Sequence, residues 1–199
     1  MAVLECRETF PTNFLTVPVY FSQDAEDAAQ VARSLGGDTA AFGVLVERYQ
    51  RILYTVAFRM LGNQDDARDA IQTAFVRAYE RLATFNPEHR FFSWMYRIVM
   101  NECLNLIRDR RPEEVLTPAL AAVGSPFDTA ASRERRAQVQ AALLQLSPDY
   151  RAVVVLRHFA GLSYDEMAAA LGVPSKTVKS RLHTARQRLG ELLLGWRTA

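Results

Sequence analysis

The sequence predicts an all-α protein made of two small helical domains joined by a flexible linker. Apolar residues recur at spacings of three and four along almost the whole chain, and no long alternating pattern typical of strands is present. A stretch rich in proline and small residues, 112–136, separates the helical segments 28–111 and 137–194. Residues 1–27 are an unassigned N-terminal extension and residues 195–199 a C-terminal tail. The 49% hydrophobic and 10% aromatic content is typical of a globular protein.

The first helical segment begins with an expected helix pair. Residues 28–35 and 39–61 have helical spacing, and Gly36 and Gly37 interrupt them before Asp38 recaps the chain. Gly62 is the expected C-cap of the second helix, and Asn63 or Asp65 can cap the next one. The expected buried stripe of the 39–61 helix is Phe42, Leu45, Val46, Tyr49, Ile52, Leu53 and Val56.

Two further helices are expected at 66–83 and 91–110, joined by the loop 84–90. The stripe predicted to be buried in the first contains Ala67, Ala70, Ile71, Ala74, Phe75, Ala78, Tyr79 and Leu82. The one in the second contains Phe92, Met95, Tyr96, Val99, Cys103 and Leu106. A polar stripe runs along the other side of the second helix and consists of Ser93, Arg97, Asn101, Asn105 and Arg108.

The second helical segment contains a predicted helix-turn-helix. Ser147 is the expected N-cap of a helix with Pro148 at its first position, and Ser163 and Glu166 form a capping box for the next helix. The turn 172–174 then leads to a last helix. Its expected inward residues are Val178, Leu182, Ala185 and Leu189.

The basic residues cluster on this last helix. The whole chain has a net charge of only +2, but 174–197 contains six Lys or Arg and one Glu. Cations and small hydroxyls at the start of a helix after a tight turn suit base edges and phosphates in a DNA groove. The alternative is a solvated face on an ordinary helical hairpin. So weakly charged a module should bind DNA poorly alone, which favours a subunit of a larger machine.

The segment 83–112 combines aromatic residues with arginines. Bases taken out of a duplex stack on aromatic rings while arginines follow the backbone, so this composition indicates capture of a single strand. The aromatic residues also have core spacing, which predicts that most of them are buried. The polar stripe and the loop are therefore the better candidates for contact with DNA.

Three stretches of the chain resemble one known family. GDTAAFGVLVERYQRILYTVAFRMLGNQDDARDAIQTAFVRAYERLATF, FFSWMYRIVMNECLNLIRDRR and LSPDYRAVVVLRHFAGLSYDEMAAALGVPSKTVKSRLHTARQRL occur in this order. Together they resemble bacterial RNA polymerase sigma factors of the extracytoplasmic-function (ECF) type, over about 36–111 and 137–194.

The resemblance implies a role for each segment. Residues 28–111 would be sigma region 2, a helical bundle that docks on core RNA polymerase and binds and melts the minus-10 element. Residues 137–194 would be sigma region 4, whose helix-turn-helix recognises the minus-35 element. The resemblance implies a cytoplasmic transcription initiation factor that directs polymerase to specific promoters and is restrained by an anti-sigma factor or another regulatory partner.

The resemblance also indicates which residues make these contacts. The resemblance assigns core polymerase docking to Asp66, Asp69, Gln72, Thr73 and Val76. Minus-10 contacts fall to Asn86, His89, Arg90, Trp94, Arg97, Asn101 and Arg108. Minus-35 contacts fall to Ser175, Lys176, Thr177, Lys179, Ser180, Arg181, His183 and Arg186. The chain departs from the family's pattern at Arg68, Ala70 and Thr73, which makes the docking surface less acidic, and at Pro174, which replaces a hydroxyl cap.

Other functional classes find little support in the sequence. No zinc-protease motif, P-loop or nucleophile elbow is present, so we expect no enzyme, catalytic residue, cofactor or metal. The run 65–69 (DDARD) resembles the aspartate-rich motif of prenyl-chain enzymes, but acidic residues are common in a first helical turn. Cys103 is expected in the core, and no apolar run reaches the length that membrane insertion requires. A stand-alone helix-turn-helix regulator, which would bind duplex DNA tightly without polymerase, is the main alternative.

Overall fold

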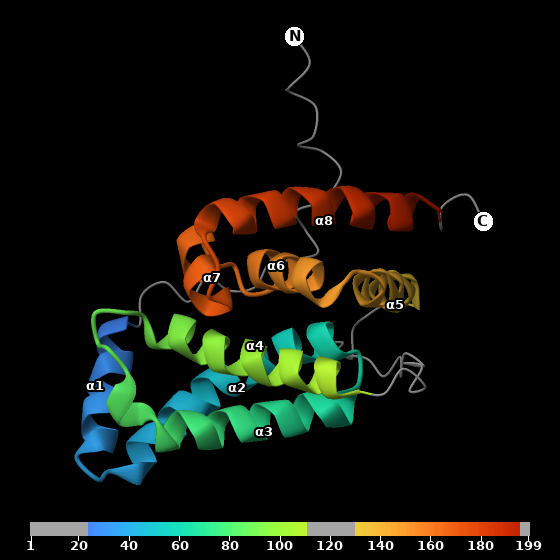
Figure 1. Cartoon of the computed structure of the whole chain (residues 1–199). Helices are drawn as coiled ribbons and strands as arrows, with labels where there is room; N and C mark the ends of the chain where they lie inside the picture. The colour runs from blue at the N-terminus through green and yellow to red at the C-terminus, as the bar shows by residue number, and fades with distance from the viewer. Residues whose placement is uncertain (1–23, 111–129, 196–199) are drawn as a thin grey trace.

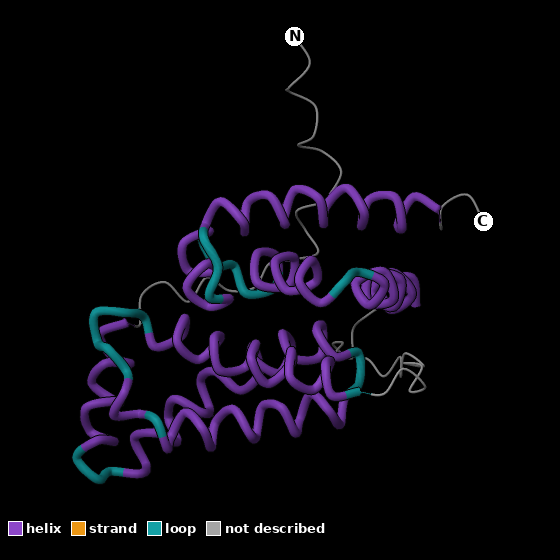
Figure 2. Tube along the Cα trace, viewed as in Figure 1, coloured by secondary structure: helices purple, strands orange, loops and turns teal. Residues whose placement is uncertain are grey.

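The computed structural model describes residues 24–110 and 130–195, and the regular secondary structure within these two ranges is all helical (Figure 1). Its elements are α1 (Asp24–Leu35), α2 (Thr39–Leu61), α3 (Gln64–Glu80), the 3₁₀ turn η2 (Leu82–Thr84), α4 (Phe91–Asp109), α5 (Ala130–Gln145), α6 (Pro148–His158), α7 (Tyr164–Leu171) and α8 (Ser175–Gly195). Short loops connect neighbouring helices within each range (Figure 2). The described helices include none with the length and apolar character of a membrane span. Cys6 and most of the expected linker and N-terminal extension lie outside the described residues.

The helix boundaries follow the expected caps closely. Asn63, rather than Asp65, caps α3, because its side-chain oxygen accepts from the backbone N–H groups of Asp65 and Asp66 at 2.8 and 3.2 Å. Gly62 ends α2 with a left-handed φ of 72°, as expected. Ser147 is the N-cap residue of α6, but its side chain makes no capping hydrogen bond.

Three helices begin earlier than expected, α3 by two residues at Gln64 and two others by more. α1 begins at Asp24, with three acidic residues in its first turn, where the helix dipole favours negative charge. α5 begins at Ala130, inside the stretch expected to be linker. The first turns of α5, AASRERR, are polar and lack an apolar stripe, so periodicity could not identify them.

Helices α1–α4 form one bundle, with small residues on α3 at its centre. Ala67, Ala70, Ala74 and Ala78 are buried and let α3 approach α2 and α4 closely. Tyr79 was expected in this buried stripe, but it is 45% exposed. Its ring packs edge-on against Phe42 at a centroid distance of 5.1 Å, so one face remains in solvent. Phe92 and Leu106 are only half-buried.

A buried carboxylate fastens α1 to α2. Asp27 is 1% exposed, accepts a hydrogen bond from the Tyr49 hydroxyl and pairs with Arg48 Nη1 at 2.5 Å. Burial raises the pKa of the Asp27 carboxyl above its usual range, and the hydrogen bonds from Tyr49 and Arg48 partly oppose that rise. The bonds give a buried carboxylate the partners it needs.

Helices α5–α8 pack directly on the first bundle, and the two units share one hydrophobic core. In Figure 1, α5, α6 and α7 lie over the side of the bundle formed by α2 and α4. The last turns of α2 are therefore buried all round, from Ala57 to Leu61, because α3 and α4 cover one side and α5 and α6 the other. The amphipathic pattern of α2 does not predict this second buried face.

Two buried arginines lie where these units meet. Arg59 Nη1 donates to Gln140 Oε1 at 2.9 Å, and its guanidinium lies 4.8 Å from the Phe159 ring centroid. Arg151 donates to the carbonyl oxygens of Leu143 and Leu146 on its own side and to that of Met60 across the junction. The junction is thus polar at its centre and apolar around it.

Replacing Gly62 with alanine should loosen this junction. A Cβ at position 62 would lie 2.6 Å from Leu144 Cδ1, and φ of 72° is strained for any L side chain. We expect Gly62→Ala to lower the free energy of unfolding by about 1–2 kcal/mol from the backbone strain alone, measured by urea denaturation.

Gly43→Ala is the matched control. A Cβ there meets nothing within 4 Å, and Gly43 lies inside α2, so this change should raise stability by about 0.5–1 kcal/mol. Equal effects of both substitutions would contradict the role given to Gly62.

Candidate nucleic-acid interface

α7 and α8 form the expected helix-turn-helix, held by the predicted inward residues. Val178, Leu182, Ala185 and Leu189 are all buried. Gly172 takes a left-handed φ of 65° at the end of α7, and its N–H donates to the Ala168 carbonyl. α8 then begins at Ser175, directly after Pro174. The turn therefore fixes which side of α8 faces away from the core.

Most of the predicted minus-35 residues lie on that outward side. Lys176, Lys179, Ser180 and His183 are exposed. Ser175, Thr177 and Arg181 are half-buried, close to the turn and to α6. The start of α8 thus presents two lysines and small hydroxyls to solvent, the groups that bond phosphates and base edges.

Two of the predicted minus-35 cations on α8 already have neighbours within the chain. Arg181 Nη2 pairs with Asp149 Oδ2 at 2.8 Å, and Lys179 Nζ lies 5.4 Å from the Tyr164 ring centroid. Arg186 was expected on the outer face but is half-buried, and its Nε is hidden from solvent without a hydrogen-bond partner. Arg186 contributes to the packing of α8 on α6, where burial and the neighbouring arginines lower the pKa of His158 to about 4.

On α4 the polar stripe lies outside and the aromatic residues lie inside. Arg97, Asn101 and Arg108 are exposed, and Arg108 Nη2 donates to Asn105 Oδ1 at 2.9 Å. Trp94 is half-buried, 5.5 Å from the ring of Phe85 and 5.7 Å from that of Phe91. Within the segment 83–112, the rings of Phe85, Phe91 and Tyr96 are buried in the core. Most of the stripe therefore faces outward while these rings are buried, although Ser93 and Asn105 are half-buried.

The loop before α4 is ordered by its own side chains. Asn86 Oδ1 accepts from the Glu88 backbone N–H at 2.9 Å, and the Asn86 carbonyl accepts from the His89 N–H at 3.0 Å. Asn86 and His89 are exposed at the surface of this turn. The turn holds both side chains beside the start of α4, next to the polar stripe.

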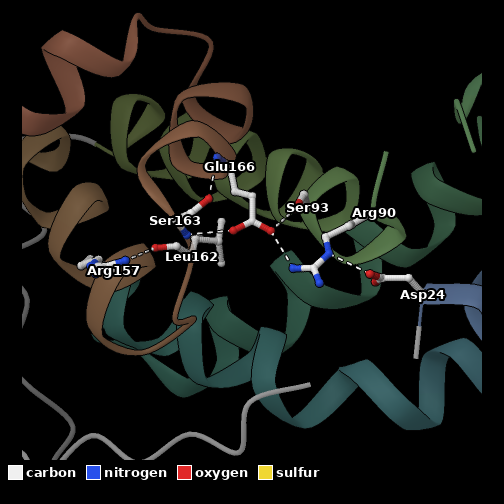
Figure 3. Close-up of polar contacts among 7 residues, drawn as sticks. All are labelled: Asp24, Arg90, Ser93, Arg157, Leu162, Ser163 and Glu166. Carbon is white, nitrogen blue, oxygen red and sulfur yellow. Dashed lines mark hydrogen bonds and ion pairs between the residues drawn. The ribbon is translucent and has the colours of Figure 1, made fainter. Parts of the chain in front are cut away.

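Arg90, the last residue of this loop, is bound on two sides (Figure 3). Its Nε pairs with Asp24 of α1 at 2.8 Å and its Nη1 with Glu166 of α7 at 3.0 Å. Ser93 Oγ lies 3.5 Å from the same Glu166 oxygen. A predicted minus-10 residue is therefore attached to the helix-turn-helix.

The Glu166 carboxylate both caps its own helix, α7, and binds Arg90 at the start of α4. Its Oε2 accepts from the Ser163 backbone N–H at 2.8 Å, which completes the predicted capping box, and its Oε1 faces Arg90. Burial alone would raise the pKa of the Glu166 carboxyl. The hydrogen bonds from Ser163 and the Arg90 guanidinium outweigh burial and hold the pKa below its usual range.

Four of the five predicted docking residues form an exposed surface on α3. Asp69, Gln72, Thr73 and Val76 all face solvent, and Val76 is 54% exposed. Asp66 differs, because it pairs with Arg110, whose Nη1 also donates to the Leu61 carbonyl at 3.2 Å. Asp66 thus holds the end of α4 against the start of α3.

The aspartate run 65–69 has no metal-binding geometry. Asp65 pairs with Arg68 at 2.5 Å, and the described residues include no group of three or more side chains suited to a metal ion. Asp65 and Asp66 lie in the first turn of α3, where the helix dipole favours negative charge.

Sequence reasoning missed the residues that join the two units. Glu166 was recognised only as a cap, while Arg59 and Gln140 were not singled out. The sequence did offer one signal of a buried polar contact, because Arg59 is a charged residue on the face of its helix that is predicted to be buried. It could not reveal that the partner lies 81 positions away.

The arrangement defines a two-part helical DNA-binding protein, with a basic helix-turn-helix in one unit and a polar helix face in the other. Family models for sigma-70 region 2 and sigma-70 region 4 match residues 45–113 and 136–189. The ECF sigma factor SigW of Bacillus subtilis is 34% identical over 170 residues, which cover 79% of this chain and 91% of SigW. The ECF sigma-E factor of Escherichia coli is 33% identical over 181 residues, covering 84% and 94%.

Solved structures show the same relationship. CnrH, in complex with the cytosolic domain of CnrY, matches with a TM-score of 0.68 and 32% identity over 85% of this chain and 97% of that one. The sigma factor RpoE of Bartonella quintana, in complex with the anti-sigma factor NepR, matches with a TM-score of 0.65 and 26% identity over 76% and 96%. The chain belongs to the ECF RNA polymerase sigma factors, and it is a transcription initiation factor.

The capping box should contribute measurably to the stability of the helix-turn-helix. Ser163→Ala removes the acceptor of the Glu166 N–H, so we expect it to lower the free energy of unfolding by about 1 kcal/mol. Urea denaturation followed by circular dichroism measures the change.

Ser180→Ala is the control for this experiment. Ser180 is exposed inside α8, where alanine is the better helix former, so stability should stay the same or rise slightly. A loss of the same size in both variants would argue against the capping role.

Proposed function

We propose that residues 28–111 act as sigma region 2 and residues 137–194 as sigma region 4. Region 2 docks on core RNA polymerase through α3 and contacts the melted minus-10 element through the loop 86–90 and α4. Region 4 places the start of α8 in the major groove of the minus-35 element. The observation that supports this most is the pair of outward polar surfaces, one on α4 and one on α8, in two units of one chain.

The chemistry of each surface fits its proposed target. Lys176 and Lys179 can donate to phosphates or to guanine, and Ser180 can bond either phosphates or bases. On α4, Arg97 and Arg108 can follow a phosphate backbone while Asn101 offers both donor and acceptor groups. Arg90 and Trp94 become available to DNA only when their neighbours within the chain give way.

The exposed side of α3 supports a protein partner. Gln72, Thr73 and the apolar Val76 lie together with Asp69, a mixture of apolar and polar groups that suits a protein surface better than DNA. We assign this side to core polymerase.

The proposal includes a cytoplasmic site of action, no catalytic activity, no cofactor and an inhibitory protein partner. NepR, the partner of the RpoE relative, is an anti-sigma factor, which supports a partner of this class for the present chain. A stand-alone helix-turn-helix regulator is the alternative, but family membership does not favour it.

Run-off transcription with bacterial core polymerase across a genomic fragment library tests the function. Start sites that appear only with this protein, and that share two spaced upstream elements, are the expected result. Tight binding of the isolated protein to duplex DNA without any dependent start site would instead favour the regulator.

Substitutions in α8 and α4 should separate recognition from melting. Lys179→Ala should weaken recognition of the upstream element by about 1–3 kcal/mol if the lysine contacts a base, and Arg181→Ala should do the same.

Asn101→Ala should reduce strand opening, measured by permanganate reactivity, and leave polymerase binding intact. Loss of polymerase binding in Asn101→Ala would refute this division of roles.

A charge on α3 should weaken docking. Val76→Asp should reduce the affinity for core polymerase at least several-fold, because it buries an unpaired carboxylate in the interface, while the exposed position keeps the fold intact. Val44→Asp makes the same change on α2 at another exposed valine and should have little effect. Equal losses in both variants would remove α3 from the docking surface.

A further inference from the structure

Two of the cations on α8 flank the side of the helix that faces away from the core. Lys179 and Arg181 are two positions apart, and each residue turns the helix by about 100°, so they lie about 200° apart around it. Lys176, Ser180 and His183 are exposed and fall between them on the outward side. These three residues form a central row on α8, with one cation at each edge.

A ring on α7 holds the cation at one edge. Lys179 Nζ lies 5.4 Å from the centroid of the Tyr164 ring, within the range in which an ammonium is attracted to an aromatic face. The same ring centroid lies 5.2 Å from the guanidinium carbon of Arg157, and Arg157 Nη1 donates to the Leu162 carbonyl oxygen at 2.7 Å (Figure 3). Tyr164 is half-buried, so α6 and the loop before α7 fix the ring that Lys179 contacts.

A carboxylate on α6 holds the cation at the other edge. Arg181 Nη2 pairs with Asp149 Oδ2 at 2.8 Å, and the Arg181 side chain is only 28% exposed. Asp149 lies in the first turn of α6, and the Arg188 guanidinium of α8 lies 4.7 Å from the ring centroid of the next residue, Tyr150. The start of α6 is thus attached to α8 at two points, which fixes Asp149 beside Arg181.

The width of a DNA groove gives the edges of α8 a different role from its central row. The major groove is about 12 Å wide, close to the diameter of a helix with its side chains, so a helix in it turns its centre to the bases and its edges to the phosphates. Contacts with phosphates carry no sequence information and strengthen binding to any duplex. A cation that is free to reach a phosphate therefore raises the affinity for wrong sequences as well as right ones.

We propose that Tyr164 and Asp149 are positioning residues for recognition of the upstream promoter element, because they restrain Lys179 and Arg181 and so limit sequence-independent binding. On any duplex, a phosphate must displace Asp149 to bind Arg181, and must draw Lys179 away from the Tyr164 ring. A base whose acceptors fit the restrained position can still bind either cation. The inference rests on the proposed function, in which α8 enters the major groove of the minus-35 element.

Two substitutions release the cations one at a time. Asp149→Asn removes the charge that binds Arg181 and keeps the size of the side chain, while Tyr164→Leu removes the ring beside Lys179 and keeps an apolar group there. Asp149→Glu keeps the carboxylate and Tyr164→Phe keeps the ring, so each should restore the behaviour of the parent. Asp165→Asn is the matched charge control, since it removes one carboxylate from the exposed first turn of α7.

Competitive run-off transcription by the full-length protein with core polymerase measures the discrimination. Two templates that differ by one base in the upstream element, and in transcript length, compete in one reaction, and the ratio of their transcripts is the specificity. We expect Asp149→Asn and Tyr164→Leu to lower this ratio about two- to fivefold by raising transcription from the mismatched template, the range of an exposed ion pair or cation–π contact. The three other variants should keep the ratio of the parent.

Salt dependence separates this role from a purely structural one. A released cation gains a phosphate contact, so binding of the polymerase complex to the mismatched template should fall more steeply with salt, by up to about one unit of the log–log slope. Loss of a residue that only stabilised the helix-turn-helix would lower transcription from both templates together, and would leave their ratio and the salt slope unchanged.

The outcomes separate failure of this inference from failure of the proposed function. If Lys179→Ala or Arg181→Ala changes the ratio while Asp149→Asn and Tyr164→Leu keep it, the inference is overturned and the role of α8 at the minus-35 element stands. A changed ratio in only one of the last two variants overturns the positioning role of the other residue. Transcription without any preference at the upstream element, in the parent and in all variants, rejects the proposed role of region 4 itself.

Discussion

The packing of α5 and α6 on the last turns of α2 is the constraint on which the rest of the structure depends. It buries α2 all round from Ala57 to Leu61 and places Gly62 directly against Leu144. A helix end enclosed in this way needs polar partners for its carbonyls, and Arg151 and Gln140 supply them from the second unit. The junction therefore fixes α6, and through α6 the helix-turn-helix that packs on it.

Several apparently functional side chains are already occupied by partners within the chain, and one of them, Arg90, is held across the contact between the units. Arg90 is fixed between α1 and α7, and Asp66 is tied to Arg110. Arg181 pairs with Asp149, and Lys179 lies over Tyr164. Guanidinium and ammonium groups near a protein surface find carboxylates or rings when no phosphate is present, so these contacts show the chemistry of the groups as well as their positions. The lysines and the α4 stripe that remain in solvent are then the groups available for a first contact with DNA.

Several features were predictable from sequence because they depend on neighbours within a few positions. The caps at Asn63 and Ser163, the left-handed Gly62 and the inward stripe of α8 follow from backbone hydrogen bonding and the 3.6-residue period. The exposed stripe on α4 follows in the same way. Arg186 and Tyr79 departed from expectation because a second helix decides how deeply a side chain at the edge of a stripe is buried.

The sequence by itself determined the helical class, the helix-turn-helix, the separation of two polar surfaces and the family to which the chain belongs. All of these are written in local periodicity, in turn chemistry and in motifs of adjacent residues. Only the tertiary structure decided that the units share a core, that Glu166 reaches Arg90 and that Arg59 is buried beside Gln140. These contacts join residues 76 and 81 positions apart, and nothing local in a chain specifies which distant surface will cover an amphipathic face.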